Sequence, residues 1–422
     1  MSIAFGLDFG TSNSALSLYK EGKTTMLDID PFNTEGKTLK SVIYYDDEER
    51  TFHCGQDAVN AYIDNDAFGR YIQSIKTFLP DASFEKTEVG NKTYRLEQLI
   101  ALLLRTIKER GETIAGEEAD HLVLGRPVVF SEDPELEKLA VTRLLTSAEM
   151  AGFKKVSLQY EPLAAAFAFE STLAQSEEKT VLVGDFGGGT SDFTIIRARG
   201  GFTQGDRKND VLGLGGVYIG GDTFDSALMW EKVAPWFGKN VRVKALYDNF
   251  TLPVSSLIMG KLKQWHQIPQ LRHPKIEATL KDIRHRADKP QLIENLQNLI
   301  EDNYGYLLFQ AIEASKCQLS NHDEAFIRFK EGKLAISEPV SLTQFQDIIE
   351  NNVSRIATCV DEVLDQAGMT PEHIDTVFLT GGSSHIPMIR ELFEKRFGLE
   401  KMKSTDAFTS VAYGLGVNNA FV

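Results

Sequence analysis

The amino-acid sequence predicts an α/β protein whose two halves resemble each other. The tripeptide Asp-Phe-Gly begins at Asp8 and again at Asp185, each time after a short apolar run and before hydroxyl residues and a second apolar run. This order is typical of two strands joined by a glycine-rich turn. The repeat therefore predicts an internal duplication in which each half offers one such turn to a shared cleft.

Length and composition limit the possible functions. The chain has 422 residues, more than one hydrophobic core usually supports, so we expect two or more domains. A formal net charge of −15 argues against nucleic acid and anionic membranes as partners. Cys54, Cys317 and Cys359 give neither a disulfide framework nor zinc-ligand spacing. Because we recognise neither a secretion leader nor an apolar stretch long enough to span a membrane, we expect a cytoplasmic protein.

The turn at residues 185–190 has the composition of a phosphate-binding loop. Three consecutive glycines tolerate positive φ angles and leave no Cβ between the backbone N–H groups and a bound anion. Beside a polyphosphate, Asp185 would hold Mg²⁺ through the water shell of the ion. One such loop alone is more often a hairpin turn without a ligand. The second copy at Asp8 favours the binding interpretation.

Hydrophobic periodicity predicts the other elements of the first half. Strands are expected over residues 24–29, 41–45, 121–129 and 156–159. Helices are expected over residues 56–65, 70–79, 96–110 and 133–151, and a helix of small residues opens at Glu161. On this pattern alone Lys76 is a surface lysine, and Glu161 is a partner of the helix dipole.

The second half contains two further glycine-rich segments. Residues 213–222 end in Gly-Gly-Asp. This composition is about equally consistent with a backbone segment that approaches a ligand closely and with a loose turn. Residues 376–380 form a predicted strand, and the loop 381–384 after it precedes a helix N-terminus suited to a phosphate or a ribose. One long helix is expected over residues 292–320, with a face that is either solvated or functional.

Taken together, the motifs resemble one known family. They follow one another as DFGTSNS, SIKTFL, RPVVF, YEPLAAA, DFGGGTSDF, IGGDTFD, EASKCQLS and FLTGGSSHIP. In this order and spacing they resemble the nucleotide-binding domain of the seventy-kilodalton heat-shock (DnaK-type) chaperones, over residues 3–416 and faintly over 237–290. The resemblance implies the actin-like, ribonuclease H-like fold, in which two duplicated lobes, each with an inserted subdomain, surround a central nucleotide cleft.

The resemblance also implies where the lobes lie in the chain. Lobe I is expected over residues 1–175, with an inserted subdomain at about 36–108. Lobe II is expected over residues 176–422, with an inserted subdomain at about 225–310 and a C-terminal helix that returns toward lobe I.

By the same resemblance the chain is an ATPase with a Mg²⁺ site. Asp8 and Asp185 would hold the waters of the Mg²⁺ ion. Lys76 would contact the γ-phosphate, and Glu161 would orient the attacking water. Phosphoryl transfer needs charge neutralisation and a positioned water more than a strong base, and these four side chains would supply both.

Other residues are implied to hold the nucleotide. Thr190 would contact the γ-phosphate, and Asp192 would associate with K⁺. The residues implied to bind ATP or ADP are Gly10, Thr11, Ser12, Asn13, Gly187, Gly188, Gly189, Thr190, Gly220, Gly221, Asp222, Glu313, Lys316, Ser320, Gly381, Gly382, Ser383 and Asp406.

The chain departs from the family pattern in three places. It ends at Val422 without the apolar linker and peptide-binding domain of full-length members, so peptide capture by the usual route is not expected. His385 and Cys317 stand where members often carry basic residues that stack on the base. After Pro127, the arginine of the interlobe relay is not at its expected offset. In outline the chain is similar to stand-alone bacterial DnaK-like proteins.

Three functions are consistent with these features. The first is a slow ATPase that acts as a chaperone-like switch on a protein partner that the sequence does not identify. The second is a small-molecule, sugar-type kinase of the same fold, and the third is an actin-like filament-forming ATPase, because fold does not fix function. The adenosine set Glu313, Lys316 and Ser320 favours the first.

Overall fold

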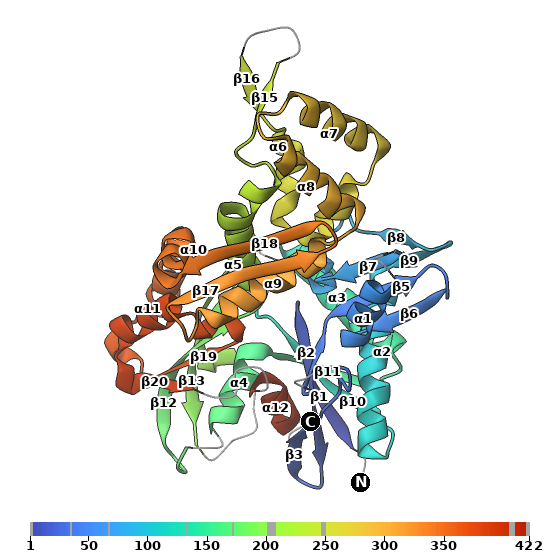
Figure 1. Ribbon diagram of the computed structural model, residues 1–422. Helices are drawn as coiled ribbons and strands as arrows, with labels where there is room; N and C mark the ends of the chain where they lie inside the picture. Colours follow the sequence, from blue (N-terminus) through green and yellow to red (C-terminus); the bar gives the residue numbers. More distant parts are fainter. Residues whose placement is uncertain are drawn as a thin grey trace. The chain divides into compact units, whose positions relative to one another are not determined.

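The structure is a computed structural model, and it describes residues 3–33, 36–65, 68–131, 133–170, 173–200, 208–245, 250–404 and 410–418. The chain forms two compact units (Figure 1). The larger unit comprises Met1–Gly220, Arg355–Ser384 and Ile389–Val422. The smaller unit comprises Gly221–Ser354 and His385–Met388. The lobe boundary expected between residues 175 and 176 stays a prediction.

The first sheet of the larger unit is built around the N-terminal hairpin. Its strands, in spatial order, are β3 (Lys23–Met26), β2 (Asn13–Lys20), β1 (Ala4–Phe9), β10 (His121–Arg126) and β11 (Lys155–Tyr160), and β4 (Thr38–Lys40) also pairs with β2. The pairs β3–β2 and β2–β1 are antiparallel. The pairs β1–β10 and β10–β11 are parallel, as expected where a helix joins neighbouring strands.

The second sheet repeats this topology around the second hairpin. Its strands, in spatial order, are β14 (Val211–Val217), β13 (Ser191–Arg199), β12 (Glu178–Phe186), β19 (Thr376–Thr380) and β20 (Met402–Ser404). The first two pairs are again antiparallel and the last two parallel. The predicted internal duplication is therefore confirmed at the level of strand order and direction.

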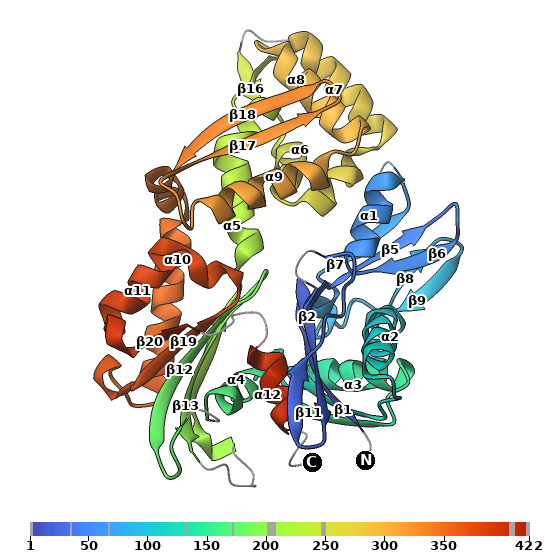
Figure 2. The ribbon, with the colours of Figure 1, turned by 60° about the horizontal axis from the view of Figure 1, so that its bottom comes forward.

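Two helices pack between these sheets (Figure 2). The helix α4 (Glu161–Glu170) packs Leu163 and Phe167 against the apolar face of β12 and β13. The C-terminal helix α12 (Ser410–Asn418) lies on the first sheet, where Ser17 Oγ donates to Ala412 O at 2.6 Å. The two helices touch at the backbone, because a Cβ on Gly414 would lie 1.7 Å from Ala164 O.

Further helices cover the outer faces of the sheets. Buried leucines of α2 (Leu96–Ala115) pack with Phe5 and Leu16 of the first sheet, and α3 (Pro134–Met150) joins the same core. On the second sheet, Phe393 of α11 (Pro387–Phe397) contacts the rings of Phe186 and Phe193. The long helix α10 (Leu342–Gln366) precedes β19 in the chain.

A small three-stranded sheet follows β4. It consists of β5 (Val42–Asp46), β6 (Thr51–Cys54) and β7 (Arg70–Gln73), with α1 (Gln56–Asp64) packed on it and the hairpin β8 (Lys86–Val89) and β9 (Lys92–Arg95) nearby in sequence. The helix expected over residues 70–79 is wrong. Residues 70–73 pair with β5 as a strand, Ser74 takes a left-handed φ of 54°, and only Ile75–Phe78 turns, as a 3-10 helix.

The smaller unit is mainly helical. Its helices are α5 (Gly221–Leu228), α6 (Ser256–Gly260), α7 (Pro274–Arg286), α8 (Pro290–Glu301) and α9 (Gly305–Gln318). Its strands form the hairpins β15 (Arg242–Lys244) with β16 (Thr251–Pro253), and β17 (Glu324–Glu331) with β18 (Leu334–Ser341). The single helix expected over residues 292–320 is wrong, because Asn303 adopts a left-handed φ of 53° and separates α8 from α9.

Most other predicted elements are confirmed within a few residues, including α1, α2, α3 and β19. No helix among the described residues combines the length and the apolar composition needed to cross a membrane.

Candidate functional site

The two glycine hairpins place their aspartates at equivalent positions. Asp8 is the next-to-last residue of β1, and Asp185 is the next-to-last residue of β12. After Asp8 the chain turns so tightly that a Cβ on Gly10 would lie 2.1 Å from Asn13 O. Only glycine fits there without displacing the backbone. The turn is held by Ser41, whose Oγ donates to Gly10 O at 2.7 Å.

The two turns lie next to each other. A Cβ built on Gly189 would be 3.8 Å from Thr11 Cγ2, which is an ordinary van der Waals distance between the second turn and the first. The segment before α5 meets the same place, because a Cβ on Gly220 would lie 2.6 Å from Gly187 O and 2.4 Å from Gly188 O. Thr11 and Gly189, 178 positions apart in sequence, therefore lie on one glycine-lined surface.

A third loop adjoins the second hairpin. Gly381 follows β19 with φ 84°, and a Cβ there would lie 2.1 Å from Phe186 O. Gly382 begins a 3-10 turn, in which Ser384 Oγ donates to Gly381 O at 2.6 Å and Ser383 is buried. The sequence-predicted loop thus lies beside the residue that follows Asp185.

Lys76 and Glu161 form an ion pair that is largely shielded from solvent. The Nζ of Lys76 donates to Glu161 Oε1 at 2.8 Å, and their side chains are 10% and 13% exposed. Burial alone would lower the pKa of Lys76, but the charges of Glu161 and Asp8 outweigh it and the pKa is raised. Lys76 is therefore a charged, enclosed lysine rather than the surface lysine that its local sequence indicates.

The carboxylates around this pair share one electrostatic environment. Burial and the negative charge of Glu161 raise the pKa of Asp8 well above its usual value, Lys76 opposes the shift, and Asp185 adds to it. Burial and Glu161 raise the pKa of Asp185 to about 7, and burial raises the pKa of Asp192 to about 6. Asp185 pairs with Asp192 across the second hairpin, and the turns that follow Asp8 and Asp185 are in contact, so these carboxylates belong to one region of the molecule.

Asp192 is fixed by its neighbours on the second sheet. Thr190 Oγ1 donates to Asp192 Oδ2 at 2.9 Å. The other oxygen, Oδ1, lies so close to the paired strand that a Cβ on Gly216 would be 2.5 Å from it. Glycine at position 216 therefore makes room for this carboxylate.

Two residues to which the sequence analysis assigned no role also shape the site. A Cβ on Gly125 would lie 3.1 Å from Glu161 Cγ, so a larger residue there would push the glutamate. Arg126 Nε donates to Pro127 O at 2.9 Å and Nη2 donates to Val128 O at 3.1 Å, while its guanidinium also pairs with Glu137. Arg126 is the first residue of the RPVVF motif, and its carbonyl and carboxylate partners are visible only in the structure.

The guanidinium of Arg126 also lies 5.3 Å from the centroid of the Tyr160 ring, and Tyr160 immediately precedes Glu161 in the chain. Its pairing partner Glu137 accepts the backbone N–H of Phe130 at 2.7 Å. Arg126 therefore holds both the segment after β10 and the end of β11 in place.

The smaller unit holds its own buried charge cluster. Lys316 Nζ donates to Asp225 Oδ2 at 2.8 Å and to Gly221 O at 3.3 Å. Burial raises the pKa of Asp225 to about 7 and that of Asp222 to about 6, and in both Glu313 adds to the shift while Lys316 opposes it. The face of α9 that carries Lys316 is therefore not merely a charged face exposed to solvent.

Asp225 Oδ1 and Ser315 Oγ in this cluster are buried and have no hydrogen-bond partner among the described residues. Such atoms suit a polar ligand. Ser320 lies beyond the end of α9, two residues after Gln318, and Glu313 is exposed. The predicted site residue Asp406 lies outside the described residues.

The two sheets have the same strand order, and in each a glycine-rich hairpin turn follows an aspartate near the end of a strand. This arrangement places the chain among the actin-like ATPases. A sequence model of the family described as Hsp70 protein matches residues 4–252 and 294–421. The chain belongs to the Hsp70 family. Members of this family are chaperone-type ATPases that use ATP and ADP with Mg²⁺, and the predicted family and fold are thereby confirmed.

Proposed function

We propose that this protein is a slow ATPase that works as a chaperone-like molecular switch. The observation that carries the proposal is the convergence of two glycine hairpins and their aspartates on the Lys76–Glu161 pair. A cytoplasmic location and action on a protein partner are part of the same proposal.

The carboxylate cluster suits a magnesium ion. Asp8, Asp185, Asp192 and Glu161 are half-buried, and Lys76 is the described cation whose charge opposes the raised pKa values of the three aspartates. Such an excess of negative charge favours a bound cation, and oxygen ligands are those that Mg²⁺ prefers. Asp8 and Asp185 would hold the ion through its waters, and Mg²⁺ would supply neutralisation of the phosphate charge.

The glycine-lined surface suits a triphosphate. Backbone N–H groups of residues 10–13 and 187–190 would bind the β- and γ-phosphates, because no side chain screens the glycines. Thr190 would contact the γ-phosphate, and Asp192 would associate with K⁺. On the family resemblance, Glu313, Lys316 and Ser320 would hold the ribose and adenine, and Asp222, Gly382 and Ser383 would also contact the nucleotide.

In hydrolysis, a water oxygen attacks the γ-phosphorus, the bond to the β–γ bridging oxygen breaks, and ADP leaves. Glu161 would accept a hydrogen bond from this water and aim it at phosphorus. Lys76, kept charged by its surroundings, would stabilise the charge on the transferred phosphoryl group. With no strong general base, we expect turnover below the ~10 s⁻¹ typical of enzymes.

The test is phosphate release from ATP by the full chain, measured alone, with a panel of sugars, and with unfolded polypeptide. We expect slow, Mg²⁺-dependent release alone and faster release with polypeptide or a protein partner. Stimulation by a sugar, with phosphorylated sugar as the product, would indicate a kinase. ATP-dependent sedimentation at high protein concentration would indicate a filament-forming protein.

A further inference from the structure

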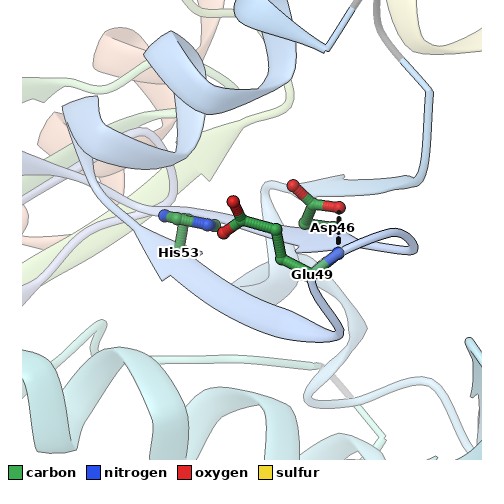
Figure 3. A group of neighbouring side chains, drawn as sticks. All are labelled: Asp46, Glu49 and His53. Atoms are coloured by element: carbon green, nitrogen blue, oxygen red, sulfur yellow. Dashed lines mark hydrogen bonds between the residues drawn. The ribbon is translucent and has the colours of Figure 1, made fainter.

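The turn between β5 and β6 carries metal-ligating side chains that lie outside the carboxylate cluster described above. Asp46 ends β5, Glu49 lies in the turn and His53 lies in β6. One ligand atom of each residue lies within 4.8 Å of the other two. Figure 3 shows the Glu49 carboxylate between the His53 ring and the Asp46 carboxylate. Imidazole and carboxylates together are the donor set of zinc-type sites.

The His53 ring is oriented from outside this triad. Its Nδ1 lies 2.8 Å from Asp57 Oδ2 on the first turn of α1, and the ring of Tyr44 stacks on it at 6.1 Å between centroids. Metal-bound histidines usually donate their second ring N–H to a carboxylate in this way. The pairing leaves Nε2 with its lone pair, where Thr51 Oγ1 makes a long contact at 3.3 Å that a cation can replace.

Asp46 is also held in place. Its Oδ1 accepts the backbone N–H groups of Glu48 at 2.8 Å and Glu49 at 2.9 Å. Its Oδ2 accepts the side-chain amide of Asn65. Each oxygen of an ionised carboxylate has two lone pairs, so Oδ2 can still bind a cation while these contacts persist. Two of the three ligands are therefore pre-oriented.

Charge and access at the turn also favour a cation. Among the described residues, no lysine or arginine forms an ion pair with Asp46 or Glu49, and Asp47 and Glu48 add negative charge. Glu49 is exposed, which gives an ion a path from solvent. Zinc bonds of ~2.1 Å separate ligand atoms by at most about 4 Å, so a small rotation of the Glu49 side chain closes the site.

We propose that Asp46, Glu49 and His53 bind a first-row divalent metal ion, with Zn²⁺ as the best fit and water as the remaining ligand. The imidazole nitrogen favours Zn²⁺ over Mg²⁺ and Ca²⁺, which prefer oxygen ligands alone. The ion would join β5, the turn and β6, and through Asp57 the start of α1. It would thereby stabilise this small sheet against unfolding.

The test is calorimetric titration of the full chain with zinc chloride, in saturating Mg²⁺ and ADP so that the nucleotide site does not compete. The variants are Glu49→Gln and His53→Gln, with Asp47→Asn as the control that changes charge in the same turn but no ligand. Asp47 and Glu49 are exposed in the turn and His53 is half-buried in β6, and circular dichroism without metal checks that each variant folds. Thermal unfolding with and without zinc gives a second readout.

We expect one zinc equivalent in the parent and in Asp47→Asn, and loss of that equivalent in Glu49→Gln and His53→Gln. Asp57→Asn should weaken it by at least about tenfold, as removal of an outer-shell carboxylate does. Zinc should raise the Tm of the parent by at least about 3 °C and leave the Tm of His53→Gln unchanged. The proposal is overturned if the parent binds no zinc, or if His53→Gln binds it as the control does.

Discussion

Lys76 Nζ lies 2.8 Å from Glu161 Oε1, although 85 residues separate the two side chains in sequence. The lysine comes from a 3-10 turn after β7, and the glutamate opens α4. Folding thus places a positive and a negative group together at the two aspartate-bearing hairpins. In the proposed site the lysine would neutralise phosphate charge and the glutamate would position the attacking water.

Lys76→Ala should lower kcat for ATP hydrolysis by about 10²-fold or more and change ATP affinity less, because its contact strengthens as charge develops on the phosphoryl group. Single-turnover hydrolysis and ATP titration separate the two quantities. Lys92→Ala, at an exposed position in β9, is the matched control and should keep the parent rate. Hydrolysis at the parent rate by Lys76→Ala would show that the assignment is wrong.

The first turn should not tolerate a side chain at position 10. Gly10→Ala places a Cβ 2.1 Å from Asn13 O, so the backbone must move and the phosphate-binding surface with it. We expect loss of ADP binding and a destabilisation of about 1–3 kcal/mol in urea unfolding. Gly260→Ala is the control, because its Cβ meets nothing within 4 Å and helix α6 should gain up to about 1 kcal/mol. Equal behaviour of the two variants would contradict this account of Gly10.

The raised pKa values predict how stability depends on pH without Mg²⁺. Asp185 and Asp192 have pKa values of about 7 and about 6, against a usual value of 3.8, so between these limits the folded state holds protons that the unfolded state has released. Their stabilising contribution is complete below about pH 4 and is lost as the pH rises to about 7. Thermal unfolding at about pH 5.5 and about pH 8 measures this loss.

A bound Mg²⁺ ion should reverse that loss. The increase in Tm on adding Mg²⁺ and ADP should therefore be larger at the higher pH, and Asp185→Asn should reduce the difference between the two pH values. An identical pH dependence in the parent and in Asp185→Asn would count against a shared carboxylate cluster.

Arg126 and Glu137 should be strongly coupled. The guanidinium also supports Pro127 O and Val128 O, so Arg126→Ala leaves two carbonyls and a carboxylate without this donor. We expect Arg126→Ala to lower the free energy of unfolding by about 1–3 kcal/mol. The double variant Arg126→Ala/Glu137→Ala should lose less than the sum of the two single losses. Urea unfolding of the four proteins provides the cycle. Additive costs would mean that the pair acts separately on its surroundings.

The duplicated hairpins could be predicted from sequence because the signal is local. The apolar runs, the aspartate and the glycines of residues 181–196 are consecutive, and the copy at residues 3–19 repeats them. β17 has a local signal of the same kind, because the buried residues Ala325, Ile327 and Phe329 alternate with exposed ones along it.

The rest of the site depends on contacts that no local pattern encodes. Lys76 reaches the carboxylates only because residues 70–73 pair with β5, and the helical spacing of Ile72, Ile75 and Phe78 indicated the wrong element. Likewise, the break between α8 and α9 depends on one left-handed residue, Asn303. The family resemblance selected Lys76 and Lys316 where periodicity favoured a solvated surface.

The most direct test of the central claim is a double-mutant cycle on Asp8 and Asp185, read as the Mg²⁺ concentration needed for ADP binding. If both carboxylates hold one ion, Asp8→Asn and Asp185→Asn should each raise that concentration by about tenfold or more, and the double variant should be little worse than either. Independent, additive increases, or ADP binding that ignores both substitutions, would contradict the claim that the two hairpins share one magnesium-bound nucleotide.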